Sequence, residues 1–270
     1  MDYKNFINLS LSQGVNFSIG KTINEAFSLV GKNAGSYIGY TIVFFFISMA
    51  AGLFGAFVPF IGGIAAGVLV TPALIMGYAT FARRSELGEP TSFENFFDAF
   101  KINYGQLVIV NLILQLVQMG LMFLLFIPFF GDAMDLIQSP EAFGDPDYIE
   151  EFLSEITATM IQYWWVFAIY IFASLTIQVV YALANYFVIF YGFGFWEAME
   201  SSRHLMGRVF IKSIVLFIII GIIVGIGTVV TLFFGILFFL PFSILASYSL
   251  FKQLAGFADG EVALEDDLII

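Results

Sequence analysis

Few residues of this chain could do chemistry. It has no cysteine and a single histidine, His204, which excludes disulfides, thiolate catalysis and clusters of histidine metal ligands. His204 follows Glu200 by four residues, so a helix would place both side chains on one face. An ion pair or a lipid-headgroup contact is the simpler interpretation of His204, and a proton relay or catalytic role is the alternative. We predict no catalytic residue, no metal-binding residue and no cofactor, and we do not expect an enzyme.

Carboxylates gather in residues 132–156, a segment that contains no lysine or arginine. Carboxylate oxygens suit hard cations such as Ca²⁺. The spacing of these acids differs from that of an EF-hand loop, however. A solvated cap or a surface for a partner is therefore the preferred interpretation, and weak Ca²⁺ binding is the alternative.

Two otherwise apolar stretches carry polar side chains at helical spacing, which defines an intramembrane polar face. Because polar groups facing lipid are costly, both sets should turn inward. They could hydrogen-bond each other and lock two helices together, or they could line a pathway or a headgroup pocket. The absence of an acid or base there weakens a proton-pump interpretation. The face comprises Asn111, Gln115, Gln118, Gln178, Tyr181 and Asn185.

The composition places these residues in a membrane protein. The chain is 60% hydrophobic and 11% charged, with a mean hydropathy of +0.94, whereas soluble domains are about 25% charged. A membrane-spanning helix needs roughly 20 apolar residues. The sequence therefore predicts an all-α polytopic integral membrane protein with six transmembrane helices in three hairpins. The predicted spans are residues 37–57, 61–82, 105–128, 157–195, 211–230 and 233–252.

The predicted fourth span is too long for a bilayer. Some 35 helical residues would reach about 50 Å, and the hydrocarbon core is about 30 Å thick. We expect this segment to protrude, tilt strongly or break, with Gly192 and Gly194 as possible breaks at its end.

An internal repeat relates residues 23–84 to residues 195–252. In each copy an amphipathic segment leads into an apolar run, a glycine-rich break and a second apolar run that contains a proline. We interpret the copy as a surface-lying helix followed by a transmembrane hairpin. Glu25-Ala26 matches Glu197-Ala198, and the spacing from Pro72 to Arg83 equals that from Pro241 to Lys252.

Interfacial amphipathic helices are expected before spans one, three and five. The first, residues 18–34, should use Ile19, Ile23, Phe27 and Val30 as its apolar face. The second, residues 91–101, should place phenylalanines on one face and Glu94, Asp98 and Lys101 on the other, with Thr91 or Ser92 as its N-cap.

Prolines and glycines indicate further features of the spans. Pro72 and Pro241 should kink their helices, either as packing bends or as sites where freed carbonyls bind polar groups. Glycines four residues apart would let another backbone approach closely. These glycines are Gly31, Gly35 and Gly39, Gly63 and Gly67, and Gly221 and Gly225.

The ten basic residues all fall on one side of the predicted topology. Loops rich in lysine and arginine stay in the cytoplasm, so both termini should be cytoplasmic and the acidic segment extracytoplasmic. Residues 1–256 would form a single six-span domain, followed by an acidic cytoplasmic tail, 257–270. The interfacial basic residues are Arg83, Arg84, Lys101, Arg203, Arg208 and Lys212.

The stretches EAMESSRHLMGRVFIK and GYATFARRSELGEPTSFENFFDAFK give the chain a resemblance to a known group. It resembles a bacterial family of six-span membrane proteins of unknown function, similar to the membrane domain of some glycerophosphodiester phosphodiesterases. The resemblance implies a fold and a bacterial inner membrane, and it implies no activity.

We expect a non-enzymatic accessory or scaffold protein that organises lipid or partner proteins through its amphipathic helices. Its partners would be membrane lipids and other membrane proteins, and not nucleic acid. The alternative is a transporter or exporter of a small amphiphile or lipid. An intramembrane enzyme ranks third, because no nucleophile–base pair or metal constellation is visible.

Overall fold

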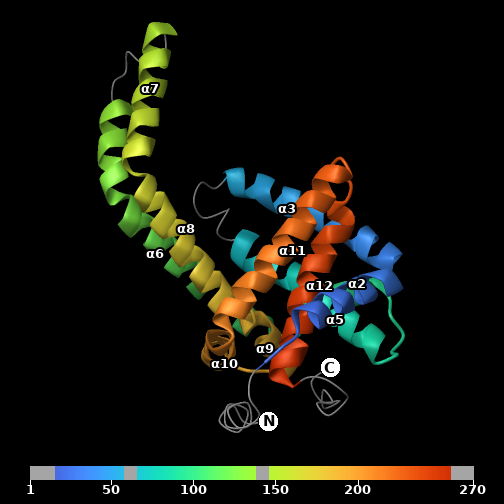
Figure 1. Cartoon of the computed structure of the whole chain (residues 1–270). Coiled ribbons are helices and arrows are strands. Elements are labelled where there is room, and N and C mark those ends of the chain that lie inside the picture. The colour runs from blue at the N-terminus through green and yellow to red at the C-terminus, as the bar shows by residue number, and fades with distance from the viewer. Residues whose placement is uncertain (1–15, 58–65, 138–145, 257–270) are drawn as a thin grey trace. The chain divides into compact units, whose positions relative to one another are not determined.

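The computed structural model describes residues 16–57, 66–137 and 146–256 (Figure 1). Within these ranges the chain forms helices and no strand, so the predicted all-α fold is confirmed. Among the described residues, six helical segments are long and apolar enough to cross a membrane, as expected of a multi-pass membrane protein. They are Ala34–Leu53, Ala66–Glu86, Tyr104–Ile127, Trp164–Tyr191, Phe210–Val230 and Ile236–Ala255.

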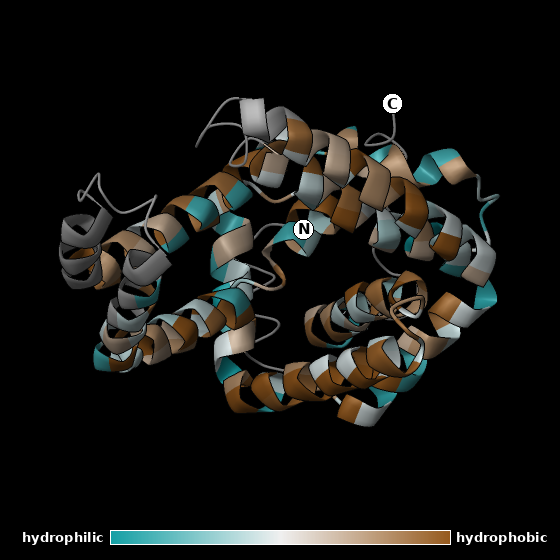
Figure 2. Cartoon of the chain, turned by 90° about the horizontal axis from the view of Figure 1, so that it is seen from above, coloured by the Kyte–Doolittle hydropathy of each residue, from teal (hydrophilic) through white to brown (hydrophobic). Residues whose placement is uncertain are grey.

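The surfaces of these spans are apolar. Hydrophobic residues predominate along most helices, and hydrophilic ones occur in short patches (Figure 2). Large side chains such as Phe46, Phe172 and Ile226 are exposed on the described chain. Such extensive apolar surface is disfavoured in water and suits contact with lipid.

The chain divides into two compact units. One comprises Met1–Leu112 with Val179–Ile270, and the other comprises Ile113–Gln178. The single domain over residues 1–256 stays a prediction.

In the first unit, a short helix followed by two membrane-spanning segments occurs twice along the chain. Two spans, Ala66–Glu86 and Ile236–Ala255, form its core and are called the inner spans. In these two, 67% and 56% of the most apolar window is buried, against 17% or less in the other four spans. The first series is α2 (Ile19–Lys32), α3 (Ala34–Phe57) and η1 (Ala66–Val70) with α5 (Thr71–Glu86), followed by η2 (Phe93–Phe100) and the start of α6 (Tyr104–Ile137). After α9 (Ala184–Tyr191), the second is α10 (Phe195–Arg208), α11 (Phe210–Val230) and α12 (Ile236–Ala255).

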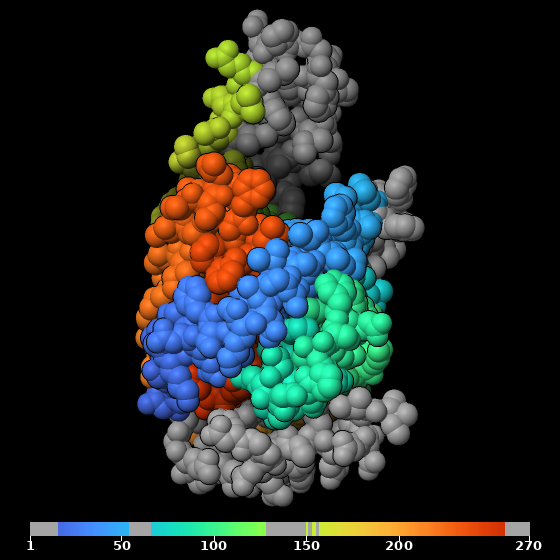
Figure 3. Space-filling view, turned by 90° about the vertical axis from the view of Figure 1, so that its right-hand side faces the viewer, coloured from blue at the N-terminus to red at the C-terminus, as the bar shows by residue number. Residues whose placement is uncertain are grey.

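Each inner span is covered by an interfacial element. η2 packs along α5, and α2 packs along α12. In Figure 3, residues of α2 and α3 (blue) lie across the surface and leave α12 (red) visible only in part. The two interfacial elements therefore lie against protein on one side.

Stacked aromatic rings fill the contact between each interfacial element, η2 or α2, and its inner span. Phe96 of η2 stacks on Tyr40 and on Phe81, with ring centroids 4.2 and 4.1 Å apart. Phe27 of α2 stacks on Phe242 of α12 at 4.2 Å. Pairs of this kind contribute about 0.5–1.5 kcal/mol beyond the area they bury.

Gly77 lets η2 approach α5 closely. A Cβ atom at this position would lie 2.0 Å from the Phe96 carbonyl oxygen and 2.7 Å from the Tyr40 hydroxyl. By contrast, no other part of the described chain comes within 4 Å of a Cβ built at Gly31, Gly35, Gly221 or Gly225. The predicted close approach at those four glycines is therefore wrong for this chain's own described contacts.

The predicted apolar face of the first interfacial helix is only part of the face that packs against protein. Val30 is buried, as are Thr22, Ala26 and Leu29, and Phe27 stacks on Phe242 at 4.2 Å, whereas Ile19 and Ile23 are half-buried. The prediction listed the large apolar residues and left out the small ones. A helix that packs against another helix also presents small residues there, because they allow close approach.

The second interfacial helix also differs from its prediction. η2 is a 3₁₀-helix, and Ser92 precedes it as predicted, with its N–H donating to the Asn95 side-chain oxygen at 2.7 Å. Asp98, predicted on the polar outer face, is buried. Three residues per turn rotate side chains differently from an α-helix, so the predicted faces do not hold.

The prolines occupy unlike positions. Pro72 lies in the first turn of α5, directly after the π-helical turn η1, so it lies where the helix changes its hydrogen-bond pattern. Pro241 lies inside α12. Gly63 lies outside the described residues, and Gly67 has no neighbour within 4 Å of an added Cβ.

The second unit holds the rest of α6 with α7 (Pro146–Gln162) and α8 (Trp164–Val180). Phe126 of α6 packs edge-on against Phe167 and Tyr170 of α8, at 5.0 and 5.6 Å. The segment predicted as the fourth span is interrupted at Tyr163, between α7 and α8, and again between α8 and α9. The over-long fourth span thus breaks, and Gly192 ends it in a left-handed conformation with φ 67°.

Candidate functional site

Two residues of the predicted polar face, Asn111 and Asn185, hydrogen-bond each other in the first unit. Asn111 donates to the Asn185 side-chain oxygen at 3.0 Å, and Asn185 donates back at 3.4 Å. Asn111 also donates to the Leu107 carbonyl at 2.7 Å. Two amides that satisfy each other lock neighbouring helices, which favours the packing interpretation over a pathway.

The rest of the polar face is not brought to one place. In the second unit, Gln118 reaches the Ser174 carbonyl at 3.5 Å, and Gln178 donates to the Ser174 hydroxyl within its own helix. Gln115 is exposed, and Tyr181 of the first unit is half-buried. The six residues therefore do not form a single site.

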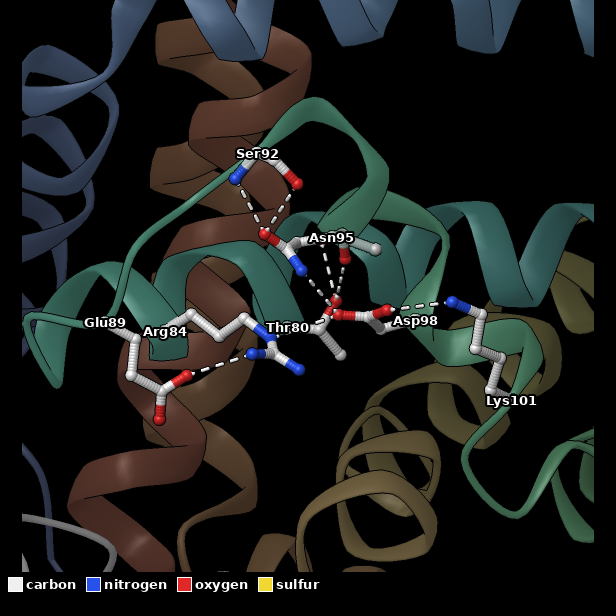
Figure 4. A network of polar contacts seen from close by, with 8 residues as sticks. Thr80, Arg84, Glu89, Ser92, Asn95, Asp98 and Lys101 are labelled. Atoms are coloured by element: carbon white, nitrogen blue, oxygen red, sulfur yellow. Dashed lines mark hydrogen bonds and ion pairs between the residues drawn. The ribbon is translucent and has the colours of Figure 1, made fainter. Parts of the chain in front are cut away.

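A charged network joins α5 to η2 (Figure 4). The Arg84 guanidinium lies 3.0 Å from Asp98 and 3.0 Å from Glu89, and Lys101 lies 3.6 Å from Asp98. Asn95 also donates to Asp98, at 3.1 Å. The buried Asp98 carboxylate is thus surrounded by donors, as a buried charge requires.

A pocket lies beside this network and has two kinds of wall. Its cavity volume is about 20 Å³, which is room for about one water molecule. Charged and apolar side chains both line it. Its lining residues are Thr80, Arg83, Arg84, Leu87, Glu89, Asp98, Ile102, Ile189 and Phe190.

A second charged network joins α2, α5 and α12. The Lys252 ammonium pairs with both Glu25 and Glu86, and its side chain is 10% exposed. Glu86 also accepts a hydrogen bond from the Tyr248 hydroxyl at 2.9 Å, and Glu25 accepts one from Ser249. Lys252 is therefore the hub between the first and last helices of this unit.

The protonation of Glu25 follows from these contacts. Burial tends to raise the pKa of Glu25, but the hydrogen bonds from Lys252 and Ser249 and the nearby ammonium outweigh it. The pKa of Glu25 is held below its ordinary value, so the carboxylate stays ionised well into the acid range.

On α10, the charges pair within the helix. Glu200 bonds Arg203, and it lies 3.1 Å from His204 Nε2. The Arg203 guanidinium lowers the pKa of Glu200, with His204 as a smaller contributor. His204 thus has the helix-face partner of the simpler interpretation.

The predicted interfacial basic residues have separate positions. Arg83, Arg84 and Lys101 lie at or beside the pocket network, whereas Arg203 and Arg208 are exposed on α10 and Lys212 bonds Asn16. Sequence reasoning missed Glu25, Glu86, Glu89 and Asp98 as partners. A usable signal existed, because carboxylates near the ends of apolar spans need cations.

Comparison with family models, curated proteins and solved structures finds no match for this chain. The resemblance to the six-span family stays an expectation. Among the described residues, no group of three histidine, aspartate or glutamate side chains could hold a metal ion.

Proposed function

We propose that the protein is a non-enzymatic accessory or scaffold protein of the bacterial cytoplasmic membrane that organises lipid or partner proteins. One observation carries the proposal: both α2 and η2 are tied by partly buried ion pairs to the ends of inner spans. Interfacial helices held in this way form a firm platform at the membrane surface rather than loosely lying amphipathic segments.

The positions of the basic residues indicate on which side of the membrane the two interfacial helices lie. The basic residues of the two networks, Arg84, Lys101 and Lys252, lie at or next to span ends. By the positive-inside rule these ends face the cytoplasm. Both termini would then be cytoplasmic as well.

The transporter alternative has less support. A pathway needs polar groups that remain available to a substrate. Asn111 and Asn185 instead bond each other, and Gln178 bonds within its own helix.

The proposal is tested by extracting the protein from native membranes in polymer nanodiscs and identifying the lipids and proteins that accompany it. We expect a composition that differs from that of the bulk membrane. This enrichment should weaken in Asp98→Asn, which loosens η2, and persist in the control Arg203→Gln on exposed α10. A wild-type composition equal to the bulk membrane would refute the proposal.

A further inference from the structure

The turn that joins α11 to α12 is apolar and has a disfavoured backbone. It lies at the tip of this hairpin (Figure 1). Leu232, Phe233 and Phe234 are 78%, 72% and 79% exposed, and Leu232 and Phe233 are left-handed, with φ 51° and 70°. Turns usually place glycine, asparagine or aspartate at such positions, because bulky side chains are disfavoured there. An apolar environment outside the described chain would stabilise these three side chains.

The N–H groups of this turn do not depend on water. Each backbone N–H from Thr231 to Phe239 donates to a group within the hairpin. The Thr231 hydroxyl closes the turn, because it donates to the Gly227 carbonyl at 2.7 Å and accepts from the Gly235 N–H at 2.7 Å. Water can bond a free N–H of an exposed turn, whereas an unbonded N–H in hydrocarbon is costly. The turn therefore has the backbone that a lipid environment requires.

The length of the hairpin brings the turn into the far leaflet. Lys212 lies near the start of α11 and Lys252 near the end of α12, and residues 213–251 contain no charged residue or histidine. Cationic side chains at span ends lie at the membrane boundary. At about 1.5 Å per residue, α11 extends about 27 Å beyond Lys212 and α12 about 24 Å before Lys252. Because the hydrocarbon core is about 30 Å thick, the hairpin is only just long enough to cross it.

We propose that the turn Thr231–Gly235 is a lipid-binding tip whose side chains Leu232, Phe233 and Phe234 insert among the acyl chains of the leaflet opposite the two lysines. Lipid fits better than a partner protein or a second copy of the chain. Thr231 has the only polar side chain of the turn and is bonded within the hairpin, so the turn presents apolar area and no group for specific recognition. The inference goes beyond the proposed function, which concerns the side of the membrane where the lysines lie.

The test measures the surroundings of the turn with a fluorophore. Because the chain has no native cysteine, Phe233→Cys can be labelled and placed in phosphatidylcholine nanodiscs with one copy in each. Lys101→Cys is the control, because Lys101 is also largely exposed on the chain. Lipids brominated on their acyl chains quench a label in hydrocarbon, and iodide quenches a label in water. We expect brominated lipid to quench position 233 about fivefold more than position 101, and iodide to show the reverse order.

Two results of this measurement would overturn the inference. Iodide quenching at position 233 as strong as at position 101 would place the turn in water. Weak quenching by both agents would show that protein covers the turn. Phe234→Cys repeats the measurement on the neighbouring side chain, so the inference stays testable if Phe233→Cys does not fold.

An asparagine at position 233 gives an independent readout. Asparagine adopts a left-handed backbone more readily than phenylalanine, so Phe233→Asn should stabilise the chain if the turn lies in water. An amide in hydrocarbon is costly, so we expect this variant instead to raise the equilibrium constant of unfolding in nanodiscs about tenfold. The apolar control Phe233→Leu should change this constant less than about threefold. A Phe233→Asn variant at least as stable as wild type would overturn the inference, and the lipids and proteins that accompany the chain would still test the scaffold role separately.

Discussion

The two inner spans bind different interfacial elements at the same positions of the predicted repeat. We call these elements covers: η2 is the local cover on α5, and α2 is the remote cover on α12. Eight residues after its proline, α5 has Thr80 and α12 has Ser249. Thr80 donates to the Asn95 carbonyl of η2 at 3.3 Å, and Ser249 donates to the Glu25 carboxylate of α2. Similar sequence thus sets where an interfacial element is bound and leaves open which element binds there.

The two covers differ in their distance along the chain. η2 follows α5 after a short turn, whereas Glu25 of α2 is 227 residues away from Lys252. The remote cover is held by a buried ammonium between two carboxylates. In the local cover, the corresponding pair is Arg84–Asp98, whose side chains are 24% and 11% exposed. Both covers are therefore held by a partly buried ion pair, and the remote cover, which the chain itself does not keep nearby, has a cation shared by two carboxylates.

Replacement of the hub should have the largest effect. Lys252→Met leaves Glu25 and Glu86 close together without their cation, and loss of one partner of a buried ion pair costs about 3–5 kcal/mol. We expect a loss of about 3 kcal/mol in the free energy of unfolding, measured by denaturant titration in detergent or nanodiscs.

The control for Lys252→Met is Lys101→Met, which breaks an exposed pair between residues three apart and should cost less than about 1 kcal/mol. Equal losses in the two variants would contradict the special role of Lys252.

The position five residues after each proline offers a second contrast. It is Gly77 in α5 and Ala246 in α12, and both residues are buried. Gly77→Ala places a Cβ atom 2.0 Å from the Phe96 carbonyl, and overpacking of this kind costs about 1–3 kcal/mol. The reverse change, Ala246→Gly, should cost about 1 kcal/mol through backbone freedom. Thermal unfolding of both variants measures the difference, and a stabilised Gly77→Ala would contradict the close approach of η2.

Glu25 and Glu197 occupy matching positions of the predicted repeat, and replacing them should affect the free energy of unfolding differently. The pKa of Glu25 is lowered in the folded state, so Glu25 adds stability at pH values above its unfolded pKa, about 4.3. This stability is lost as the pH falls through the lower folded pKa. Glu25→Gln should therefore lose stability near pH 7 and flatten the dependence below about pH 4.3.

The matched change, Glu197→Gln, alters a carboxylate that caps its own helix by accepting from the Gly194 N–H at 3.3 Å. It should cost less stability near pH 7 than Glu25→Gln, because Glu197 loses one capping hydrogen bond whereas Glu25 loses its bonds to Lys252 and Ser249. Equal losses in both variants would show that Glu25 has no special role.

Much of the architecture could be predicted from the sequence, because charge is costly in lipid. Stretches without charged residues predicted six spans, and the part of the chain that the structure describes has six candidates. Gly192 also ends its helix where the sequence indicated. These features depend on local composition and backbone preference, which a sequence contains directly.

The contacts of the site could not be predicted in the same way. Helical spacing shows which residues share a face, but it does not show which neighbour covers that face. Asp98 was therefore placed outside, although it is buried against Arg84. The closely approached Gly77 was missed because its neighbour, Phe96, belongs to another element.

The central claim is that α2, η2 and the span ends they cover face one compartment. Single cysteines can be introduced at the exposed positions Lys21, Lys101 and Arg203, and at Glu150 in α7, into a chain that has no native cysteine. A membrane-impermeant thiol reagent should label the first three from the cytoplasmic side and position 150 from the opposite side. Labelling of positions 101 and 150 from the same compartment would contradict this account.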